Sequence, residues 1–481
     1  MKNLCLFLFI FLFSHQVFSQ ITFEKTFGTY DDDEGEAIAV CQDGTYILAG
    51  NVTNIYTGDN NVFLVRINLY GDTIWTRTYG IDYQDFYTYD MIQTFDQGFI
   101  ITGYTYVADT SMPFLLKYSE EGQFLWIKKY GSQLPDGYAY AVVQKPDSGF
   151  MICGREDFYN SDWYHRPFLL ETDQNGVCTW SGIYTVEDYA YYDVYNLCLS
   201  SEYEYVMCGY FEQPIVSTIE HAWLFKVDSG MNINWSRVYG PSGYTSGLSD
   251  VLLNDDGGYM LCGSTYQGEI PLPGTNYDIY LIKTDSAGIA QWTKSIGYPD
   301  KAEYGRCMDI TSDGGYIIGG QTASLSGQKD IWLVRAEENG DTIWTRKFGG
   351  IYNESVRDIC VTPDGGYLLC GATDSYSIGG SDIYLVKTDE NGLMTNINDN
   401  DELMAGVTVL PNPGNGIFWI RNHPENTFYS IYDIHGKMII RNKKADELEE
   451  KVDISSCSSG MYLLNISSAS SSRSFKLIVN H

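Results

Sequence analysis

One pattern of residues recurs about every fifty positions along most of this chain. A glycine closes the second apolar run of each unit, at Gly50, Gly103, Gly154, Gly209, Gly263, Gly320 and Gly371. The third run ends in an acidic turn, as in DIYLVKTDENG at 382–392, and a tryptophan opens the fourth run of six units. Four short apolar runs per period are typical of the blades of a β-propeller. The sequence therefore predicts an all-β fold containing a seven-bladed β-propeller.

The two ends of the repeat region indicate how the ring closes. The seventh unit lacks the fourth run, because the chain becomes polar a few residues after Gly392. At the other end, Phe23 to Gly28 (FEKTFG) is similar to a tryptophan-type run with no unit before it. We therefore expect this segment to supply the outermost strand of the last blade, which would leave no long unpaired edge in the ring.

The first nineteen residues have the composition of a signal peptide. Lys2 provides a positive start, residues 4–13 are apolar, and small residues allow cleavage near Ser19/Gln20. No later run approaches the length needed to span a bilayer. The sequence thus predicts an exported protein, secreted or on the outer cell surface, with no membrane insertion after the signal is removed.

The formal net charge of −32 is unevenly distributed. Residues 405–481 hold 8 Lys and Arg against 7 Asp and Glu, so the remaining 22 basic and 55 acidic residues give −33. Such an acidic surface would repel nucleic acid and anionic membranes, which excludes both as expected partners. The acidic loop at 31–34 leaves a Ca²⁺ site open, although the sequence calls for no cofactor.

Ten cysteines remain after signal removal. Four of them, Cys153, Cys208, Cys262 and Cys370, directly precede the repeat glycine, where other units carry small residues. Two pairs ten residues apart, Cys198/Cys208 and Cys360/Cys370, would flank a tight hairpin, so cross-strand disulfides are an alternative to buried free thiols.

The last 75 residues follow a different pattern. After a predicted linker at 398–406, short alternating runs separated by Gly, Asn and Pro indicate a small Ig-like antiparallel β-sandwich over 407–481. Its recognisable positions are Pro411, Asn412, Pro413, Gly416 and Phe418, then Asp433 and Gly436, then Gly460 and Tyr462, and finally Lys476. This block resembles the type A sorting domain of the type IX secretion system of Bacteroidota. The resemblance implies that the secretion machinery is a partner and that the domain is commonly removed on export.

The repeats over 20–397 also resemble a known family, the seven-bladed propeller repeats (SBBP) of bacterial surface proteins. The shared features are the DG-aromatic hairpin, the D-x-x-x-x-K-x-D-x-x-G run and the W-x-x-x-aromatic-G run, all present within 278–371. That family shares no activity that could be transferred to this chain, so function has to be sought in the sites.

The loops predict one minimal and one elaborated face of the ring. Tight DGG and ENG turns lie on one face, whereas the long, varied connections emerge on the other. The long loops carry aromatic residues that could stack on sugars or dock a peptide, or else pack loop on loop. The candidate ligand-binding residues are Tyr87, Tyr89, Tyr159, Trp163, Tyr164, Tyr191 and Tyr192.

Four polar residues occupy one recurring place near the start of the predicted innermost strand, namely Asp90, Asn196, Asp250 and Asp358. At the mouth of a central channel they could hold a cation or water, or they could accept backbone hydrogen bonds. The sequence leaves the metal content of the protein undetermined.

Recognisable catalytic motifs are missing from the sequence. The propeller region holds only His165 and His221, with no HExxH, GxSxG or GxxxxGK motif. We therefore expect a non-enzymatic binding protein whose ligand is a glycan or a protein. The alternatives are a polysaccharide hydrolase or lyase with paired carboxylates, and a structural adhesion component.

Overall fold

The computed structural model describes residues 21–394 and 407–479, except for short internal segments. These segments are 108–109, 161, 185–190, 202, 213–218, 242–243, 267–276, 300, 324–326, 378, 412–413, 424–426, 434–437, 446–448 and 468–471. Residues 21–394 form one compact unit, and the strands after residue 407 belong to a second. Every regular element of the described residues is a β-strand.

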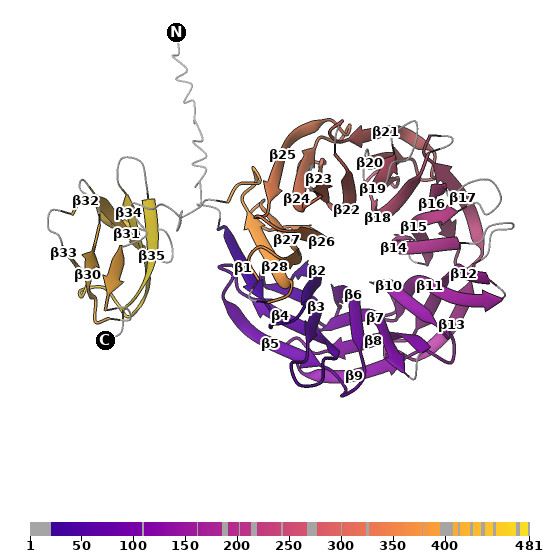
Figure 1. Cartoon of the computed structure of the whole chain (residues 1–481), viewed down its shortest axis with the longest axis horizontal. Coiled ribbons are helices and arrows are strands. Elements are labelled where there is room, and N and C mark those ends of the chain that lie inside the picture. Colours follow the sequence, from indigo (N-terminus) through magenta and orange to yellow (C-terminus); the bar gives the residue numbers. More distant parts are fainter. Residues whose placement is uncertain are drawn as a thin grey trace, which may run out of the picture. The chain divides into compact units, whose positions relative to one another are not determined.

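The larger unit is a ring of antiparallel sheets with a propeller-like arrangement (Figure 1). Five of its sheets have four strands each. They are β2 (Glu34–Val40), β3 (Tyr46–Thr53), β4 (Asn60–Ile67) and β5 (Thr73–Tyr79); β6 (Phe86–Gln93), β7 (Phe99–Val107), β8 (Thr110–Tyr118) and β9 (Phe124–Lys129); β18 (Ser246–Leu253), β19 (Tyr259–Tyr266), β20 (Tyr277–Thr284) and β21 (Ala290–Ile296); β22 (Glu303–Ile310), β23 (Tyr316–Ala323), β24 (Lys329–Ala336) and β25 (Thr342–Phe348); and β26 (Glu354–Val361), β27 (Tyr367–Thr373) and β28 (Asp382–Thr388) with β1 (Phe23–Phe27).

An eight-stranded sheet completes the ring. It joins two further groups through one parallel bridge between His165 and Tyr191. The groups are β10 (Gly137–Gln144), β11 (Phe150–Asn160), β12 (Asp162–Thr172) and β13 (Cys178–Ile183), followed by β14 (Tyr191–Ser201), β15 (Glu204–Glu212), β16 (Glu220–Val227) and β17 (Ile233–Tyr239). Figure 1 shows β2, β6, β10, β14, β18, β22 and β26 around the centre of the ring. The expected all-β fold is therefore confirmed.

The N-terminal strand closes the ring as the sequence predicts. Strand β1 pairs with β28, and Phe23 lies opposite Lys387. This is the register of the outer tryptophans, since Trp75 lies opposite Arg66 and Trp344 opposite Arg335. The Phe23 ring also packs against Gly71 of the neighbouring sheet, as the tryptophans of other sheets pack against the equivalent glycines. Phe23 thus takes the place of the missing seventh tryptophan.

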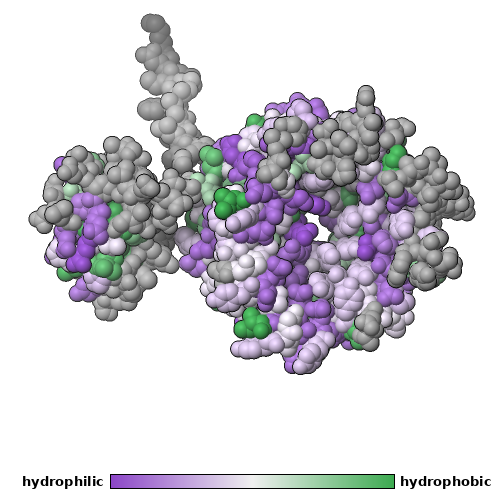
Figure 2. All heavy atoms as spheres, in the orientation of Figure 1, coloured by the Kyte–Doolittle hydropathy of each residue, from purple (hydrophilic) through white to green (hydrophobic). Residues whose placement is uncertain are grey.

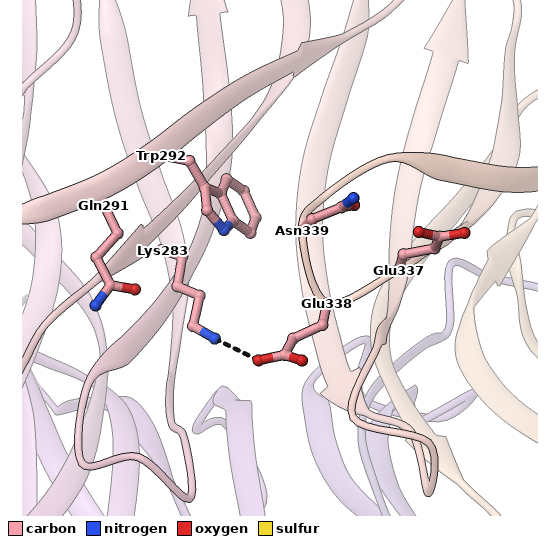
Figure 3. A pocket seen from close by; sticks show the side chains of 6 residues that line it. All are labelled: Lys283, Gln291, Trp292, Glu337, Glu338 and Asn339. Carbon is pink, nitrogen blue, oxygen red and sulfur yellow. Dashed lines mark hydrogen bonds and ion pairs between the residues drawn. The ribbon is translucent and has the colours of Figure 1, made fainter.

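The recurring charged residues hold each hairpin to its own sheet. The Lys387 side chain is fully buried and pairs with Asp364 at 2.9 Å (Nζ to Oδ1), and Arg335 pairs with Asp313 at 2.5 Å in the same manner. Lys283 contacts Glu338 of the next sheet at 3.0 Å, beside Trp292 (Figure 3). The shallow groove drawn there is built from residues that recur around the ring, so it belongs to the repeat and is not a distinctive site.

A β-bulge interrupts every innermost strand at the same place, and the repeat glycine lies across from it. A Cβ atom added to Gly371 would overlap the carbonyl oxygen of Ser355, and one added to Gly103 would overlap that of Tyr87. The bulge brings that carbonyl close to the glycine, so no side chain fits. This contact explains why the glycine recurs in every unit.

We expect Gly371→Ala to destabilise the ring unit, because either the bulge or strand β27 must move to admit the methyl group. Overpacking of this kind costs about 1–3 kcal/mol, and denaturant unfolding of the full chain measures the loss. Gly44→Ala is a poor control because Gly44 has a positive φ, whereas Ala372→Gly alters the neighbouring position without adding an atom. Equal stability of Gly371→Ala and wild type would contradict the bulge geometry.

The ten described cysteines are all free thiols. The hairpins place Cys198 opposite Val206 and Asn196 opposite Cys208, and Cys360 lies opposite Leu368 in the same way. The expectation that Cys198/Cys208 and Cys360/Cys370 are cross-strand neighbours was wrong, because the first cysteine of each pair lies opposite a residue eight positions later and the second opposite a residue twelve positions earlier. Burial raises the pKa of the Cys153, Cys208, Cys262 and Cys370 thiols well above the usual range.

The smaller unit contains two sheets around one apolar core. Strands β29 (Thr408–Leu410), β30 (Ile417–Arg421) and β33 (Glu449–Asp453) form the first sheet. Strands β32 (Met438–Lys444), β31 (Phe428–Asp433), β34 (Gly460–Ser467) and β35 (Ser472–Val479) form the second. Phe418, Tyr429, Tyr462 and Leu477 belong to the shared core.

The motif residues of this unit hold the ends of its strands. Gly416 has a φ of 90°, and a Cβ atom there would meet the backbone of Ser455. The Tyr462 hydroxyl donates to the carbonyl of Ser458 at 2.8 Å. Lys476 lies opposite Leu463 and Asp433 opposite Tyr462 in the second sheet, and Pro411 follows β29. Asn412, Pro413 and Gly436 lie outside the described residues.

Candidate binding site at the centre of the ring

The bulge of each innermost strand leaves one residue without a partner in the ladder. These seven bulge residues are Glu36, Tyr89, Tyr140, Tyr195, Ser249, Arg306 and Arg357. Their strands surround the centre of the ring, where Figure 2 shows the surface hollowed and edged by hydrophilic residues. Unlike the repeat glycine, which is the same in all seven units, this position holds four different residue types around the ring. The bulge is therefore a repeated backbone feature whose side chain varies around the ring.

Three bulge tyrosines lie side by side on neighbouring strands. The ring centroids of Tyr89 and Tyr140 are 4.9 Å apart, and those of Tyr140 and Tyr195 are 5.6 Å apart. Tyr89 and Tyr195 remain 37% and 36% exposed, although burial raises the pKa of both hydroxyls. Both side chains are thus partly accessible while the protein covers the rest of each ring, as expected for residues that line a narrow opening.

Further tyrosines on strands β6, β7, β10 and β15 extend this row. Tyr104 stacks on Tyr87 at 4.9 Å and meets Tyr138 edge-on at 4.6 Å, while Tyr210 lies 5.9 Å from Tyr195. We call the whole set the tyrosine cluster, and its members are Tyr87, Tyr89, Tyr104, Tyr106, Tyr138, Tyr140, Tyr195 and Tyr210. Amphipathic rings with free edges suit the apolar faces and hydroxyls of sugars.

A charged group borders the tyrosine cluster between β11, β12 and β14. Arg155 lies 3.1 Å from Asp157 (Nε to Oδ1) and 3.3 Å from Asp193 (Nη1 to Oδ1). The His165 imidazole lies between the same carboxylates, 3.6 Å from an oxygen of each. The Tyr210 hydroxyl donates to Asp193 at 2.7 Å. Asp157 lies opposite His165 across the β11–β12 hairpin, whereas Asp193 is brought to it by the parallel bridge to β14, which no local spacing in the sequence indicates.

The two carboxylates of this group respond differently to burial. Burial opposes ionisation of Asp193, but the neighbouring His165, Arg155 and Tyr210 outweigh it and lower the pKa of this carboxyl. Burial raises the pKa of Asp157, and Arg155 offsets only part of the effect. Asp193 is therefore a fixed negative charge that orients Arg155 and His165.

The opposite side of the opening carries arginine. Arg357 lies 3.7 Å from Glu36 (Nε to Oε2) and 3.3 Å from Glu34 (Nη2 to Oε2). Burial raises the pKa of Glu36 to about 8 against the pull of Arg357, whose own pKa the nearby Glu36 raises. Arg306 contacts Gln321 at 3.4 Å (Nη2 to Oε1) and lies over the Tyr304 ring. No ion pair of the described residues includes Arg306.

The aromatic residues predicted to bind a ligand lie in different environments in the structure. Tyr87 and Tyr89 belong to the tyrosine cluster, and Tyr191 meets the His165 ring edge-on at 5.3 Å. Tyr164 is half-buried on β12 opposite Phe158. The backbones of Tyr159 and Trp163 pair at the end of the β11–β12 hairpin, and their side chains lie outside the described residues. Tyr192 is only 2% exposed and packs on Trp223, so its assignment to a ligand face was wrong.

The four predicted channel residues connect neighbouring sheets and do not form a ring for a cation. Asp358 accepts from the backbone N–H groups of Ile38 and Ile359 at 2.9 and 2.8 Å. Asp90 accepts from Met91 and Val142, and Asp250 from Val251 and Met308, in the same geometry. Asn196 donates to Asp250 at 2.6 Å. Of the two interpretations left open by the sequence, the structure supports the one with backbone acceptors.

The acidic loop before β2 is also occupied by backbone contacts. Asp33 accepts from the N–H groups of Thr53, at 2.7 Å, and of Thr29, and Asp32 accepts from that of Ser381 at 3.0 Å. Within the described part of the chain, no three His, Cys, Asp or Glu side chains are arranged to hold a metal ion.

Comparison with known proteins identifies the smaller unit. Residues 408–480 match the family described as the secretion system C-terminal sorting domain. This unit is a type IX secretion sorting domain. The match covers the motif from Pro411 to Lys476, and the sorting domain implies export to the cell surface or beyond through the type IX machinery. Among the described residues we find no helix with the length and apolar character of a membrane span.

The ring has more distant similarities. The chain is 27% identical over 179 residues to the regulatory protein FlaEY of Caulobacter vibrioides, which covers 32% of this chain and 18% of that protein. PorZ, a surface component of the type IX secretion system of Porphyromonas gingivalis, matches 92% of this chain and 64% of its own, with 11% identity and a TM-score of 0.35. The β-propeller domain of the trilobed protease from Pyrococcus furiosus matches 80% of this chain and 99% of its own, with 9% identity and a TM-score of 0.42.

Proposed function

We propose that this chain is a seven-bladed β-propeller that binds an extracellular glycan at the centre of its long-loop face, after export through its Ig-like sorting domain. The proposal relies mainly on one observation, the tyrosine cluster at the bulge positions. Structural tyrosines would be expected to recur with the repeat, yet those at bulge positions are confined to β6, β10 and β14. A scaffold whose repeated backbone carries varied side chains at its centre is typical of a protein with a binding site there.

Three features of the cluster favour a saccharide. The rings of Tyr89 and Tyr195 are accessible, which suits stacking on the apolar face of a sugar. Their hydroxyls, with Arg155 and His165 nearby, offer hydrogen bonds to sugar hydroxyls. The row spans three innermost strands, β6, β10 and β14, so it could contact several units of a saccharide chain. Cleavage near Ser19/Gln20 and release or anchoring after export remain parts of the proposal that only the mature protein can test.

Tyr195→Ala in the full mature chain is expected to weaken glycan binding about tenfold, because it removes one stacking face worth roughly 1.4 kcal/mol. Glycan-array screening identifies the ligand, and isothermal titration then measures the loss. Tyr70→Ala is the matched control, since Tyr70 is 46% exposed on the tight β4–β5 turn, which belongs to the opposite, minimal face. No binding of the wild type to any glycan, or equal loss in both variants, would contradict the proposal.

A second function is favoured by the charged group beside the cluster. An imidazole oriented by a carboxylate is the usual arrangement of a general base, and a second carboxyl with a raised pKa lies within reach of it. This arrangement fits the alternative of a polysaccharide-cleaving enzyme. New reducing ends in a bound polysaccharide would favour that function, whereas an unchanged polysaccharide would favour binding alone. A purely structural adhesion component would show neither binding nor cleavage.

A further inference from the structure

The bulge residues divide the opening into two chemically different halves. Tyr89, Tyr140 and Tyr195 occupy consecutive innermost strands on one side. Arg306 and Arg357 occupy consecutive sheets on the other, and Ser249 and Glu36 stand at the two junctions. Two adjacent guanidinium groups are unexpected here, since the residues before the sorting domain carry a net charge of −33.

The two arginines differ in how far their charges are neutralised. Arg357 has two glutamates within 4 Å, whereas Arg306 contacts only the neutral Gln321 and the Tyr304 ring among the described contacts. Burial and then the charge of Arg357 lower the pKa of Arg306. A guanidinium carries five N–H donors in a planar fork, and one contact uses few of them. Arg306 thus retains donors for an acidic group inside the opening.

The two halves are close enough to act on one ligand. Tyr195, two sheets away from β22, lies within electrostatic range of Arg306, and Tyr89 within range of Arg357. Ser249 between them donates to the carbonyl of Gly305 at 3.1 Å, which fixes the strand that carries Arg306. A single sugar unit placed in the opening would meet aromatic faces on one side and guanidinium on the other.

We propose that the opening selects acidic saccharides, with the sugar ring against Tyr195 and Tyr140 and its carboxylate or sulfate held by Arg306 and Arg357. This inference rests on the proposed glycan-binding function and names its ligand class. The expectation that anionic partners are repelled concerns the net charge of the chain, whereas Arg306 places a guanidinium without a carboxylate partner among the described contacts at the opening. Two oxygens of a carboxylate or a sulfate match the guanidinium fork, whereas a neutral sugar would leave Arg306 without an anionic partner.

The test compares matched oligosaccharides on the full mature chain by isothermal titration. The probes are an oligogalacturonate for the carboxylate, a sulfated galactan oligosaccharide for the sulfate, a neutral galactan oligosaccharide, and a tetraglutamate peptide. We expect at least one acidic saccharide to bind at least tenfold more tightly than the neutral one, and binding to weaken as salt increases. Whichever acidic saccharide binds more tightly identifies the oxyanion.

Arg306→Gln should reduce binding of the acidic saccharide about tenfold or more and leave the neutral one unchanged. Arg237→Gln is the matched control, since it removes the same charge from an outer strand where Arg237 lies over Trp235. Equal binding of acidic and neutral saccharides, no effect of Arg306→Gln, or tight binding of tetraglutamate would overturn the inference while leaving glycan binding intact. Absence of binding to all saccharides would overturn the proposed function as well.

Discussion

Deletion of residues 21–28 is expected to unfold most of the ring unit, and not merely to trim one end of it. Strand β1 contributes five paired residues to β28, and Phe23 and Phe27 pack into the core between the last and the first sheet. Two partly buried phenylalanines at about 2 kcal/mol each, with several hydrogen bonds at roughly 1 kcal/mol, sum to at least about 5 kcal/mol. That loss is comparable with the whole stability of a typical domain, about 5–15 kcal/mol.

Thermal unfolding of the mature chain with and without the segment measures this effect. Phe23→Ala should lose about 2 kcal/mol, because the ring packs against Gly71 in the place of a tryptophan. Thr26→Ala, on the exposed side of the same strand, should change stability by less than about 0.5 kcal/mol. A deletion variant that melts at the wild-type temperature would show that the ring does not depend on β1 for closure.

The fold could be predicted from the sequence because the repeat records contacts within single sheets. The lysine of the third strand recurs because it pairs with the aspartate of its own hairpin, as Lys387 does with Asp364. The tryptophan recurs because the next sheet presents a glycine turn to it. Each contact joins residues of one sheet or of two neighbouring sheets. The residues that make it therefore recur around the ring and can be recognised in a single sequence. Phe23 was recognisable for the same reason.

Hairpin register was harder to predict than strand order. The bulge adds one residue to each innermost strand and shifts the pairing of every residue before it. The pattern of apolar residues does not reveal a bulge, since both sides of that strand remain partly buried. The tight turn, and not the bulge, sets the pairing of the cysteines, because Cys198 and Cys208 and their partners lie on the turn side of the bulge. Most bulge residues were overlooked, although four of them directly precede a predicted polar position, as Tyr89 precedes Asp90 and Arg357 precedes Asp358.

Most of the tyrosine cluster, apart from the predicted Tyr87 and Tyr89, and the arginines escaped prediction for a different reason. Aromatic residues in the long loops attracted attention, yet Tyr138, Tyr140, Tyr195 and Tyr210 lie within strands. Their grouping depends on how successive sheets meet around the opening, which no local spacing encodes. Alignment of the seven units at the glycine would have exposed one column that holds three tyrosines, two arginines, a serine and a glutamate.

The aspartates between sheets confer a pH dependence that the sequence did not indicate. Burial raises the pKa of Asp90 to about 6, of Asp250 to about 7 and of Asp358 to about 8, despite two backbone N–H donors on each. A folded-state pKa above the unfolded value means that the folded ring binds the proton more tightly. This contribution to stability is fully present below about pH 4 and is lost as the pH rises through 6 to 8.

Asn196→Asp is expected to turn this mild dependence into a strong one. Asn196 Nδ2 lies 2.6 Å from Asp250 Oδ1, so the substitution would place two buried carboxylates in contact. Two carboxylates at that distance cannot both ionise, and they hold one proton between them. The folded-state pKa of the pair is thereby raised further, and stability present at pH 5 is lost as the pH rises above 7. We expect near wild-type unfolding at pH 5 and a loss of about 3 kcal/mol or more at pH 9.

Two companion variants separate this effect from simple loss of a contact. Asn196→Ala removes the hydrogen bond without adding a charge, so it should cost about 1–2 kcal/mol equally at both pH values. Asn196→Asp combined with Asp250→Asn restores an amide opposite a carboxylate and should recover most of the stability at pH 9. An equal loss for Asn196→Asp at pH 5 and pH 9 would contradict the contact, because only a pair of facing carboxylates makes the cost depend on a shared proton.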